Sequence, residues 1–327
     1  VDGTIGIGHT RWATHGRPTE TNAHPHANDR VALVHNGIIE NFKELRGELE
    51  AAGHRFETET DTETVVHLIT FYLEQQMTPQ EAVAATLKRL EGAFALAIIF
   101  AGRHDLMVGA RRGSPLAVGY GDGEMFLGSD ALALAPLTDR ICYLEEGDWV
   151  ELTKSGAKVY DADGQPAARE VKQTALSGAL IGKGEYRHFM QKEIFEQPAV
   201  IGDTMHAMLN PAERTITLPE IPVDLASVPR VSISACGTAF YAGMVAKYWI
   251  EQLARTPVEI DVASEFRYRN LPMVDDGLAM FISQSGETMD TLSALRYAVA
   301  QNQHIVSVVN VPESTIARES HGVLRTL

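Results

Sequence analysis

The sequence has 327 residues, of which 45% are hydrophobic and 22% charged, and a formal net charge of -15. No run of 18 apolar residues and no basic, apolar leader is visible, which argues against a membrane span or a signal peptide. The acidic balance argues against a nucleic-acid-binding surface, because phosphate contacts need clustered Lys and Arg. The only two cysteines, Cys142 and Cys236, lack metal-ligand spacing, which favours a reducing cytoplasm and gives no support for zinc.

A chain of this length suits two domains, and its first 160 residues alternate short apolar runs with turns. The predicted strands are Thr4–Thr10, Val31–His35, Phe94–Phe100, Leu106–Ala110, Leu116–Tyr120, Met125–Leu127, Ile141–Leu144 and Trp149–Leu152. Apolar residues recur at helical spacing over Phe42–Ala52 and Val65–Tyr72, and Pro79 opens a third helix that runs towards Leu90. Many strands with a few grouped helices indicate an α+β sandwich.

The composition shifts to small and polar residues over 161–185, which predicts a linker. An amphipathic helix is then expected over Arg187–Met208. Beyond residue 228 strands alternate with helices, namely strands at Val231–Ala235 and Ala279–Ser283 and helices at Phe240–Leu253 and Glu287–Ala300. This alternation predicts a doubly wound parallel sheet that binds ligands at the carboxyl ends of its strands.

Three stretches near the start gather the side chains needed to grip an amino acid and polarise an amide. Gly8–Gly16, Asn22–His26 and His35–Asn41 carry Arg, Trp, Asn and several His. Arg11 offers a bidentate fork for a carboxylate, and Asp61 offers the opposite charge for an ammonium group. Taken singly, such an Arg is usually a solvated charge and such an Asp is usually a helix N-cap. The combination favours a ligand site.

Asn36 and Gly37 are candidates for an oxyanion hole, because an Asn side chain beside a Gly amide is a common donor pair. The alternative is an Asn-Gly hairpin turn between apolar runs. Both interpretations can hold together, since a turn can itself present the donors.

Hydroxyl-rich segments follow two apolar strands of the second half. Thr238 comes after Val231–Ala235, and Ser283–Thr288 follows the next predicted strand. Hydroxyls and free amides at helix N-termini can bind an anion without Lys or Arg, which reconciles an acidic chain with a phosphorylated ligand. A lone Ser-x-Ser-Gly is more often a cap and turn, but two such elements in successive strand-helix units are more specific.

The three early stretches resemble the glutamine pocket of the class II, N-terminal-nucleophile amidotransferases. With Ala235–Thr238 and Ser283–Thr288, the chain resembles the glutamine–fructose-6-phosphate aminotransferase family, and Tyr186–Pro198 matches the opening of that family's second domain. The resemblance implies an α+β N-terminal-nucleophile (αββα) glutaminase domain over 1–160, a linker over 161–185, and an α/β doubly wound sugar isomerase (SIS) lobe with its leading helix over 186–327.

The resemblance also implies the site residues. It assigns glutamine binding to Arg11, Trp12, Thr14, His15, Gly16 and Asp61, the oxyanion hole to Asn36 and Gly37, and sugar-phosphate binding to Thr238, Ser283, Gln284, Ser285 and Thr288. For His24 and His26, packing around a turn is at least as good an interpretation as catalysis. Ala239 stands where the family often has Ser, so one hydroxyl contact to the sugar is in question.

The activity that the resemblance implies is formation of D-glucosamine 6-phosphate and L-glutamate from D-fructose 6-phosphate and L-glutamine, the first step of the hexosamine pathway. Glutamine hydrolysis, ammonia transfer and ketose-aldose isomerisation would follow one another, with no cofactor and no metal. We expect a cytoplasmic enzyme that forms a homodimer through its SIS domains and binds neither nucleic acid nor membrane. We also expect the chain to be an internal fragment, inactive by itself, without the family's N-terminal Cys segment and second SIS lobe.

Two alternatives were weighed. An amidophosphoribosyltransferase would need an acidic phosphoribosyl-diphosphate motif after the glutaminase domain, and none is seen in the sequence. A non-catalytic sugar-phosphate sensor would usually carry a helix-turn-helix domain, where this chain has the glutamine-pocket motif.

Overall fold

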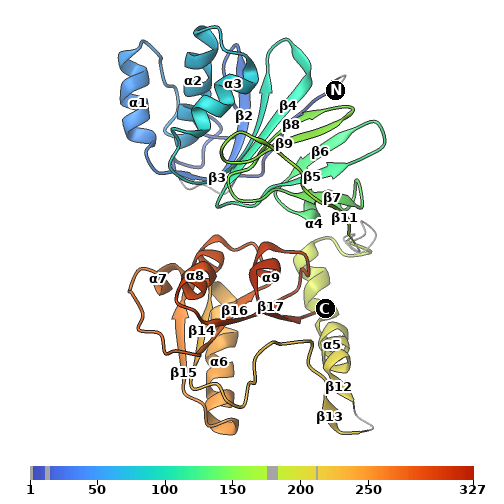
Figure 1. The fold of residues 1–327 in the computed structure, drawn as a ribbon. Coiled ribbons are helices and arrows are strands. Elements are labelled where there is room, and N and C mark those ends of the chain that lie inside the picture. The colour runs from blue at the N-terminus through green and yellow to red at the C-terminus, as the bar shows by residue number, and fades with distance from the viewer. Residues whose placement is uncertain (1–2, 12–14, 175–182, 211–212) are drawn as a thin grey trace. The chain divides into compact units, whose positions relative to one another are not determined.

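The computed structural model describes residues 3–11, 15–174, 183–210 and 213–327 (Figure 1). The chain divides into two compact units, Val1–Leu180 and Ile181–Leu327. Within the described residues no helix is long and apolar enough to cross a membrane.

The first unit is built mainly from antiparallel strands. Its helices are α1 (Phe42–Ala51), α2 (Asp61–Glu74), α3 (Pro79–Leu87) and α4 (Ala131–Leu134). Its strands are β1 (His26–Ala27), β2 (Val31–Ile39), β3 (Gly92–Phe100), β4 (Arg103–Arg112), β5 (Ala117–Tyr120), β6 (Met125–Gly128), β7 (Arg140–Tyr143), β8 (Trp149–Thr153), β9 (Gly156–Tyr160), β10 (Pro166–Ala167) and β11 (Val171–Gln173). One sheet has the order β1-β2-β3-β4-β8-β9-β10 and the other has the order β11-β7-β5-β6.

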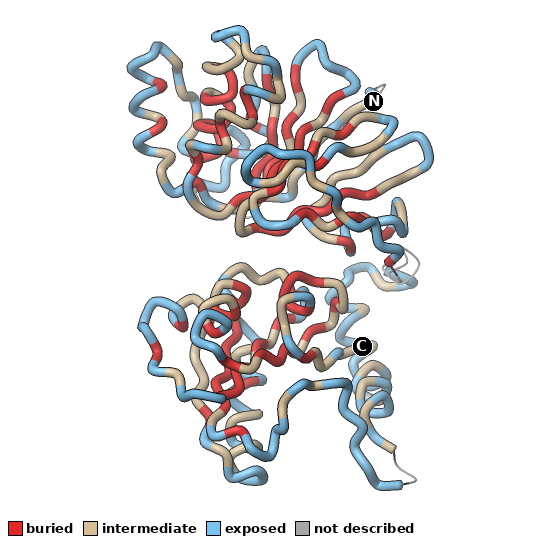
Figure 2. Tube along the Cα trace, in the orientation of Figure 1, coloured by how far each residue is buried: buried red, intermediate tan, exposed pale blue. Residues whose placement is uncertain are grey.

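These elements stack in four layers. Helices α1, α2 and α3 lie together on one face of the larger sheet and enclose the main core with it (Figures 1 and 2). The opposite face packs against the smaller sheet through residues such as Ala95, Val150, Val118 and Cys142. The short helix α4 packs on the outer face of the smaller sheet. The predicted α+β αββα sandwich is therefore confirmed, with a single short helix as its fourth described layer.

Local sequence explains where the helices of this unit begin. Thr78 and Glu81 form a reciprocal capping box at α3, with Pro79 in the first turn. Thr60 caps α2, since its hydroxyl accepts a hydrogen bond from the Glu63 backbone N–H. Because Thr60 takes the capping role, the Asp61 carboxylate is not the N-cap.

Some predicted boundaries differ from the structure. The predicted strand Thr4–Thr10 is wrong, because this segment has no ladder pairing. Gly6 and Gly8 leave alternate positions without side chains, so Ile5 and Ile7 do not hold a strand. Within the range predicted as a linker, β10 pairs with β9 and β11 pairs with β7. These short edge strands carry few large apolar residues, so their periodicity gave no signal.

The second unit alternates strands and helices. Its helices are α5 (Phe189–Met208), α6 (Gly237–Leu253), α7 (Ala263–Phe266), α8 (Met289–Ala300) and α9 (Thr315–Glu319). Its strands are β12 (Leu209–Asn210), β13 (Thr215–Ile216), β14 (Val231–Ala235), β15 (Val258–Val262), β16 (Leu278–Ser283), β17 (His304–Val309) and β18 (Gly322–Arg325). The main sheet has the order β15-β14-β16-β17-β18, and every pair in it is parallel.

Helices cover both faces of this parallel sheet. One face packs against α7, α8 and α9 around Phe266 and Phe281, and the other packs against α6 around Ile233 and Val258. Side chains along β16 alternate between the two cores, as a strand buried on both faces requires. The predicted doubly wound lobe and its leading helix are confirmed.

Candidate functional site

Asp61 is a buried carboxylate at the start of α2. Its side chain has a relative exposure of 4%. One oxygen, Oδ2, accepts a hydrogen bond from the Ile39 backbone N–H at 2.8 Å. The same oxygen lies 3.9 Å from the Nδ1 atoms of His15 and His35, too far for hydrogen bonds. A carboxylate with spare acceptor capacity at a helix N-terminus is suited to receive a cationic ligand group.

Glu63 holds the segment that leads into α2. Its carboxylate accepts hydrogen bonds from the backbone N–H groups of Glu57 and Thr58, each at 2.8 Å, and from the Thr58 hydroxyl at 2.7 Å. Burial raises the pKa of Glu63, but hydrogen bonds from His67, Glu57 and Thr58 outweigh burial and lower the pKa to about 2. The turn before Asp61 is thus fixed by an ionised side chain at neutral pH.

Arg11 forms side-chain hydrogen bonds with the loop that follows it in the sequence. Its backbone has a positive φ of 51°. Its guanidinium donates hydrogen bonds to the carbonyl oxygens of His15 at 3.0 Å, Gly16 at 3.3 Å and Arg17 at 3.1 Å. The role of Arg11 as the carboxylate fork stays a prediction, since its observed partners are all in the loop.

The other loop residues are only partly described. Trp12 and Thr14, predicted to bind glutamine, lie outside the described residues. Gly16 has a φ of 74°, and a Cβ there would lie 2.9 Å from Asn22 Nδ2. Positive φ and close approach together require glycine at this point.

Asn36 and Gly37 lie inside strand β2, so the hairpin-turn alternative is wrong. Gly37 is opposite Phe94 in the ladder. Its φ is 124°, and a Cβ would approach the Ala93 carbonyl oxygen to 2.1 Å. Asn36 is exposed and lines a cavity of about 500 Å³ together with His9 and Thr10. The oxyanion role of the pair stays a prediction.

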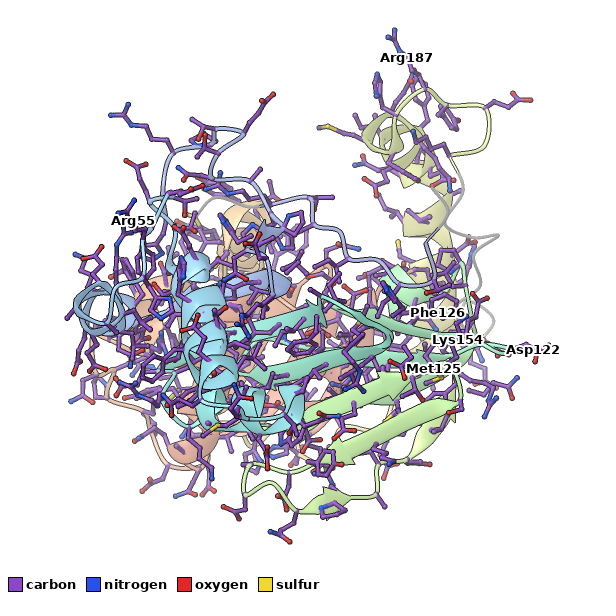
Figure 3. All side chains as sticks on the ribbon, turned by 90° about the horizontal axis from the view of Figure 1, so that it is seen from above. Arg55, Asp122, Met125, Phe126, Lys154 and Arg187 are labelled. Carbon is purple, nitrogen blue, oxygen red and sulfur yellow. The ribbon has the colours of Figure 1, made fainter. Side chains whose placement is uncertain are left out.

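A second cavity, of about 670 Å³, adjoins the first, and Gly6 and Met107 line both. Met125, Phe126 and Lys154 are among its lining residues and lie near one another in Figure 3. None of the predicted site residues lines this second cavity.

Several histidines of the described chain gather near Asp61, among them His15 and His35. The ring centroids of His9 and His24 are 4.6 Å apart, and those of His24 and His26 are 4.9 Å apart. Burial, followed by the charges of neighbouring groups such as His9, lowers the pKa of His24 to about 3. Burial lowers the pKa of His35 to about 4, although Asp61 opposes this change. Both imidazoles are therefore neutral near pH 7, and among the described residues no group of His, Cys, Asp and Glu is placed to hold a metal ion.

We expect the first unit to lose stability as the pH falls from about 6.5 to 4. An unfolded chain protonates His35 near its ordinary pKa of about 6.5, whereas the folded chain resists protonation down to about 4. The unfolded state then binds more protons, which lowers the free energy of unfolding by about 3 kcal/mol at pH 4. Urea unfolding followed by NMR signals from β2 at pH 7 and pH 4 measures this loss.

A His35→Gln variant should show a smaller pH dependence. The exposed His104 gives a matched control, because His104→Gln should leave the dependence unchanged. An equal dependence in both variants would mean that His35 is not the titrating group.

The predicted sugar-phosphate residues converge in the second unit. Strands β14 and β16 are adjacent and parallel, so Thr238 at the start of α6 and the Ser283–Thr288 loop share one edge of the sheet. Ser283 Oγ lies 2.9 Å from Thr288 Oγ1 and accepts a hydrogen bond from the Gly286 N–H at 3.0 Å. Gln284 and Ser285 are exposed. Ligand binding by these residues stays a prediction, but the topology brings them together.

Neighbouring loops fix this turn in ways that the sequence did not indicate. Gln284 donates to Asn310 Oδ1 at 3.3 Å, and Glu287 Oε1 accepts from the Thr315 N–H at 2.7 Å. Gly286 has a φ of 65°, and a Cβ there would lie 1.9 Å from Ser314 Oγ. No sequence motif marked residues 310–315, because they act through contacts that only the fold creates.

Two family models match the chain. A model described as "Glutamine amidotransferase domain" matches residues 9–136, and one described as "SIS domain" matches residues 224–327. Proteins named glutamine–fructose-6-phosphate aminotransferase [isomerizing] match along the whole chain. The protein from Bradyrhizobium diazoefficiens is 62% identical over 328 residues, and that from Brucella suis is 60% identical over 327 residues. The chain covers 54% of each, so it spans about half the length of these relatives.

Solved structures show weaker likeness. The C-terminal domain of glucosamine-fructose-6-phosphate aminotransferase from Francisella tularensis is 42% identical, with a TM-score of 0.41, over 44% of this chain and 41% of that chain. A glutamine phosphoribosylpyrophosphate amidotransferase from B. subtilis is 17% identical, with a TM-score of 0.42, over 91% of this chain and 66% of that chain. At these scores the structural likeness supports no further argument.

Proposed function

The chain belongs to the glutamine–fructose-6-phosphate aminotransferase family, and from this premise we propose that it serves the formation of glucosamine 6-phosphate and glutamate from fructose 6-phosphate and glutamine. The observation that carries the proposal is that one chain holds both a buried carboxylate at a helix N-terminus, Asp61, and a hydroxyl-lined loop at Ser283–Thr288. These suit the nitrogen donor and the phosphorylated acceptor respectively.

The first unit would bind glutamine. Asp61 would receive the α-ammonium group. The Arg11 guanidinium would release its hydrogen bonds to loop carbonyl oxygens and bind the α-carboxylate in their place. Asn36 and the Gly37 N–H would stabilise the oxyanion that forms when a nucleophile attacks the side-chain amide. Cys142 does not suit that nucleophilic role, because burial raises the pKa of its thiol to about 11.

The second unit would bind the phosphorylated sugar. The N-termini of α6 and α8 present backbone amides at the same sheet edge, and Thr238, Ser283, Ser285 and Thr288 add hydroxyl groups. Such a site binds a phosphate with dipoles and neutral donors, so it needs no cluster of Lys and Arg. Ammonia would then condense with the sugar carbonyl at C2, releasing the carbonyl oxygen as water, and isomerisation of the resulting imine would give the 2-amino aldose. The location that fits this metabolism is the cytoplasm, and the assembly that fits the family is a homodimer through SIS domains.

We expect Ser283→Ala to weaken binding of fructose 6-phosphate about tenfold. The change removes the oxygen that accepts from Gly286 and contacts Thr288, so the loop loses both a ligand donor and its internal brace. Isothermal titration calorimetry with fructose 6-phosphate measures the effect, and fructose without phosphate should bind far more weakly.

Ser307 in the adjacent strand β17 provides the control. It is buried, and within the described residues its hydroxyl has no hydrogen-bond partner, so Ser307→Ala should leave the affinity unchanged. Unchanged affinity in Ser283→Ala would remove this loop from the site.

Formation of glucosamine 6-phosphate is to be assayed in a protein that spans the full length of the relatives. Turnover of another phosphosugar in place of fructose 6-phosphate would overturn the substrate assignment.

A further inference from the structure

Side-chain hydrogen bonds join the segment 22–26 to the turn that leads into α2. Every second residue of that segment takes part. Asn22 bonds to Glu59, His24 to Thr62, and His26 to Thr60. Asn22 Nδ2 donates a hydrogen bond to Glu59 Oε2 at 3.3 Å, and the Glu59 backbone N–H donates one to Asn22 Oδ1 at 3.1 Å. The Nε2 atoms of His24 and His26 lie 3.1 Å and 3.2 Å from the hydroxyl oxygens of their threonines.

Among the described residues, Thr62 is the one of these three partners whose side chain also bonds to strand β2. Its Oγ1 also lies 3.0 Å from Nδ1 of His35, a buried residue of strand β2. One hydroxyl therefore bridges the 22–26 segment, strand β2 and helix α2. These three pieces of the chain carry, or directly adjoin, the predicted glutamine-binding residues.

The protonation states constrain this bridge. His24 and His35 are neutral near pH 7, because burial lowers the pKa of each imidazole. A hydroxyl carries one proton, so Thr62 can donate to only one of the two imidazoles, and at least one imidazole must donate to Thr62 Oγ1 when both bonds form. The tautomers of the two histidines are thus coupled through one oxygen atom.

The outer nitrogens of both imidazoles are unsatisfied. His24 Nδ1 and His35 Nε2 are buried, and neither has a hydrogen-bond partner in the described part of the chain. Within the ranges that the structure describes, the bond to Thr62 is the one side-chain hydrogen bond of either ring. Loss of the hydroxyl would leave both rings held by packing alone, and His35 Nδ1 lies 3.9 Å from Asp61 Oδ2.

We propose that Thr62 is a positioning residue of the glutamine pocket, whose hydroxyl sets the segment 22–26 and strand β2 relative to Asp61 through His24 and His35. The inference rests on the proposed glutamine site. Thr62 acts through these histidines and is not itself assigned a contact with glutamine.

Helix α2 supplies a matched control for the test. Thr64 lies two residues further along, is fully buried, and its hydroxyl has no hydrogen-bond partner among the described residues. Thr62→Val and Thr64→Val therefore make the same isosteric change, but only the first removes hydrogen bonds. Thr62→Ser keeps the hydroxyl, and Thr62→Ala is a second hydroxyl-free variant that places no methyl group between the rings, for use if Thr62→Val does not fold.

The first measurement is calorimetric titration of the chain with L-glutamine. We expect Thr62→Val, or Thr62→Ala, to bind about tenfold more weakly, which corresponds to loss of one to two buried hydrogen bonds. Thr62→Ser and Thr64→Val should stay within about twofold of the wild type. Thermal unfolding of each variant checks that the affinity is compared among folded proteins.

The second measurement is the imidazole nitrogen chemical shift of His24 and His35, which reports the tautomer of each ring. Thr62→Val should change both sets of shifts and Thr64→Val neither, an outcome that general destabilisation of α2 would not give. Wild-type affinity in a folded, hydroxyl-free Thr62 variant overturns the inference and leaves the glutamine site standing. Absence of glutamine binding in the wild type overturns the proposed site, and the inference with it.

Discussion

Replacing Gly37 by alanine should destabilise the first unit by about 3 kcal/mol or more. The backbone at this position has a φ of 124°, which side chains rarely permit, and an added Cβ would lie 2.1 Å from the carbonyl oxygen of Ala93. That oxygen belongs to strand β3, which is paired on both sides in the larger sheet, so it cannot move away without breaking a ladder. The unfavourable φ and the steric clash of the added Cβ therefore both lower the stability of the variant.

The matched control is Gly47→Ala in helix α1. A Cβ there would meet nothing within 4 Å, and alanine is favoured over glycine inside a helix, so stability should rise by about 0.5–1 kcal/mol. Urea unfolding followed by NMR signals from β2 and β3 reports the first unit alone. A Gly37→Ala chain as stable as the wild type would show that the strand adopts another path at this residue.

Asp61→Asn should weaken glutamine binding about 100-fold. The change keeps the shape of the side chain and an oxygen that can accept from the Ile39 N–H, but it removes the negative charge. A buried ammonium group that loses its counter-charge costs on the order of 3 kcal/mol, which corresponds to about two powers of ten in affinity. Calorimetry with L-glutamine measures the change.

Asp161→Asn is the control for this substitution. Asp161 also lies in the first unit and accepts hydrogen bonds from the backbone N–H groups of Asp163 and Gln165, which are not among the predicted pocket residues. Its replacement should leave glutamine affinity unchanged. If Asp61→Asn bound glutamine as tightly as this control does, the ammonium group would have to be bound elsewhere.

The strands that sequence reasoning predicted best are those whose apolar pattern suffices on its own. Val231–Ala235 is a continuous run of small and apolar residues buried on both faces, and β14 has the same bounds. The pattern failed at Thr4–Thr10, where isoleucines alternate with glycines and no ladder partner is present. It also gave no signal for β10 and β11, which are stabilised by neighbouring strands more than by their own side chains.

The same contrast holds for the candidate sites. The residue types at Arg11, Asp61 and Ser283–Thr288 indicated their chemistry, because an amino acid and a phosphate each demand a small set of partners. Whether Asn36-Gly37 formed a turn was not decidable locally, since the dipeptide suits a hairpin as well as a kinked strand. Pairing with β3 decided it, because residues as far as Ile39 find ladder partners there.

By itself, the sequence determined the division into two units, the class of each unit, and the residue types on which the two site predictions rest, because side-chain periodicity and functional groups are local properties. Only the tertiary structure decided that the Thr62 hydroxyl joins His24 and His35. Those bonds link residues 38 and 27 positions apart. The sequence does not show which groups the Thr62 hydroxyl will bond to, because the packing of α2 against β2 sets these partners.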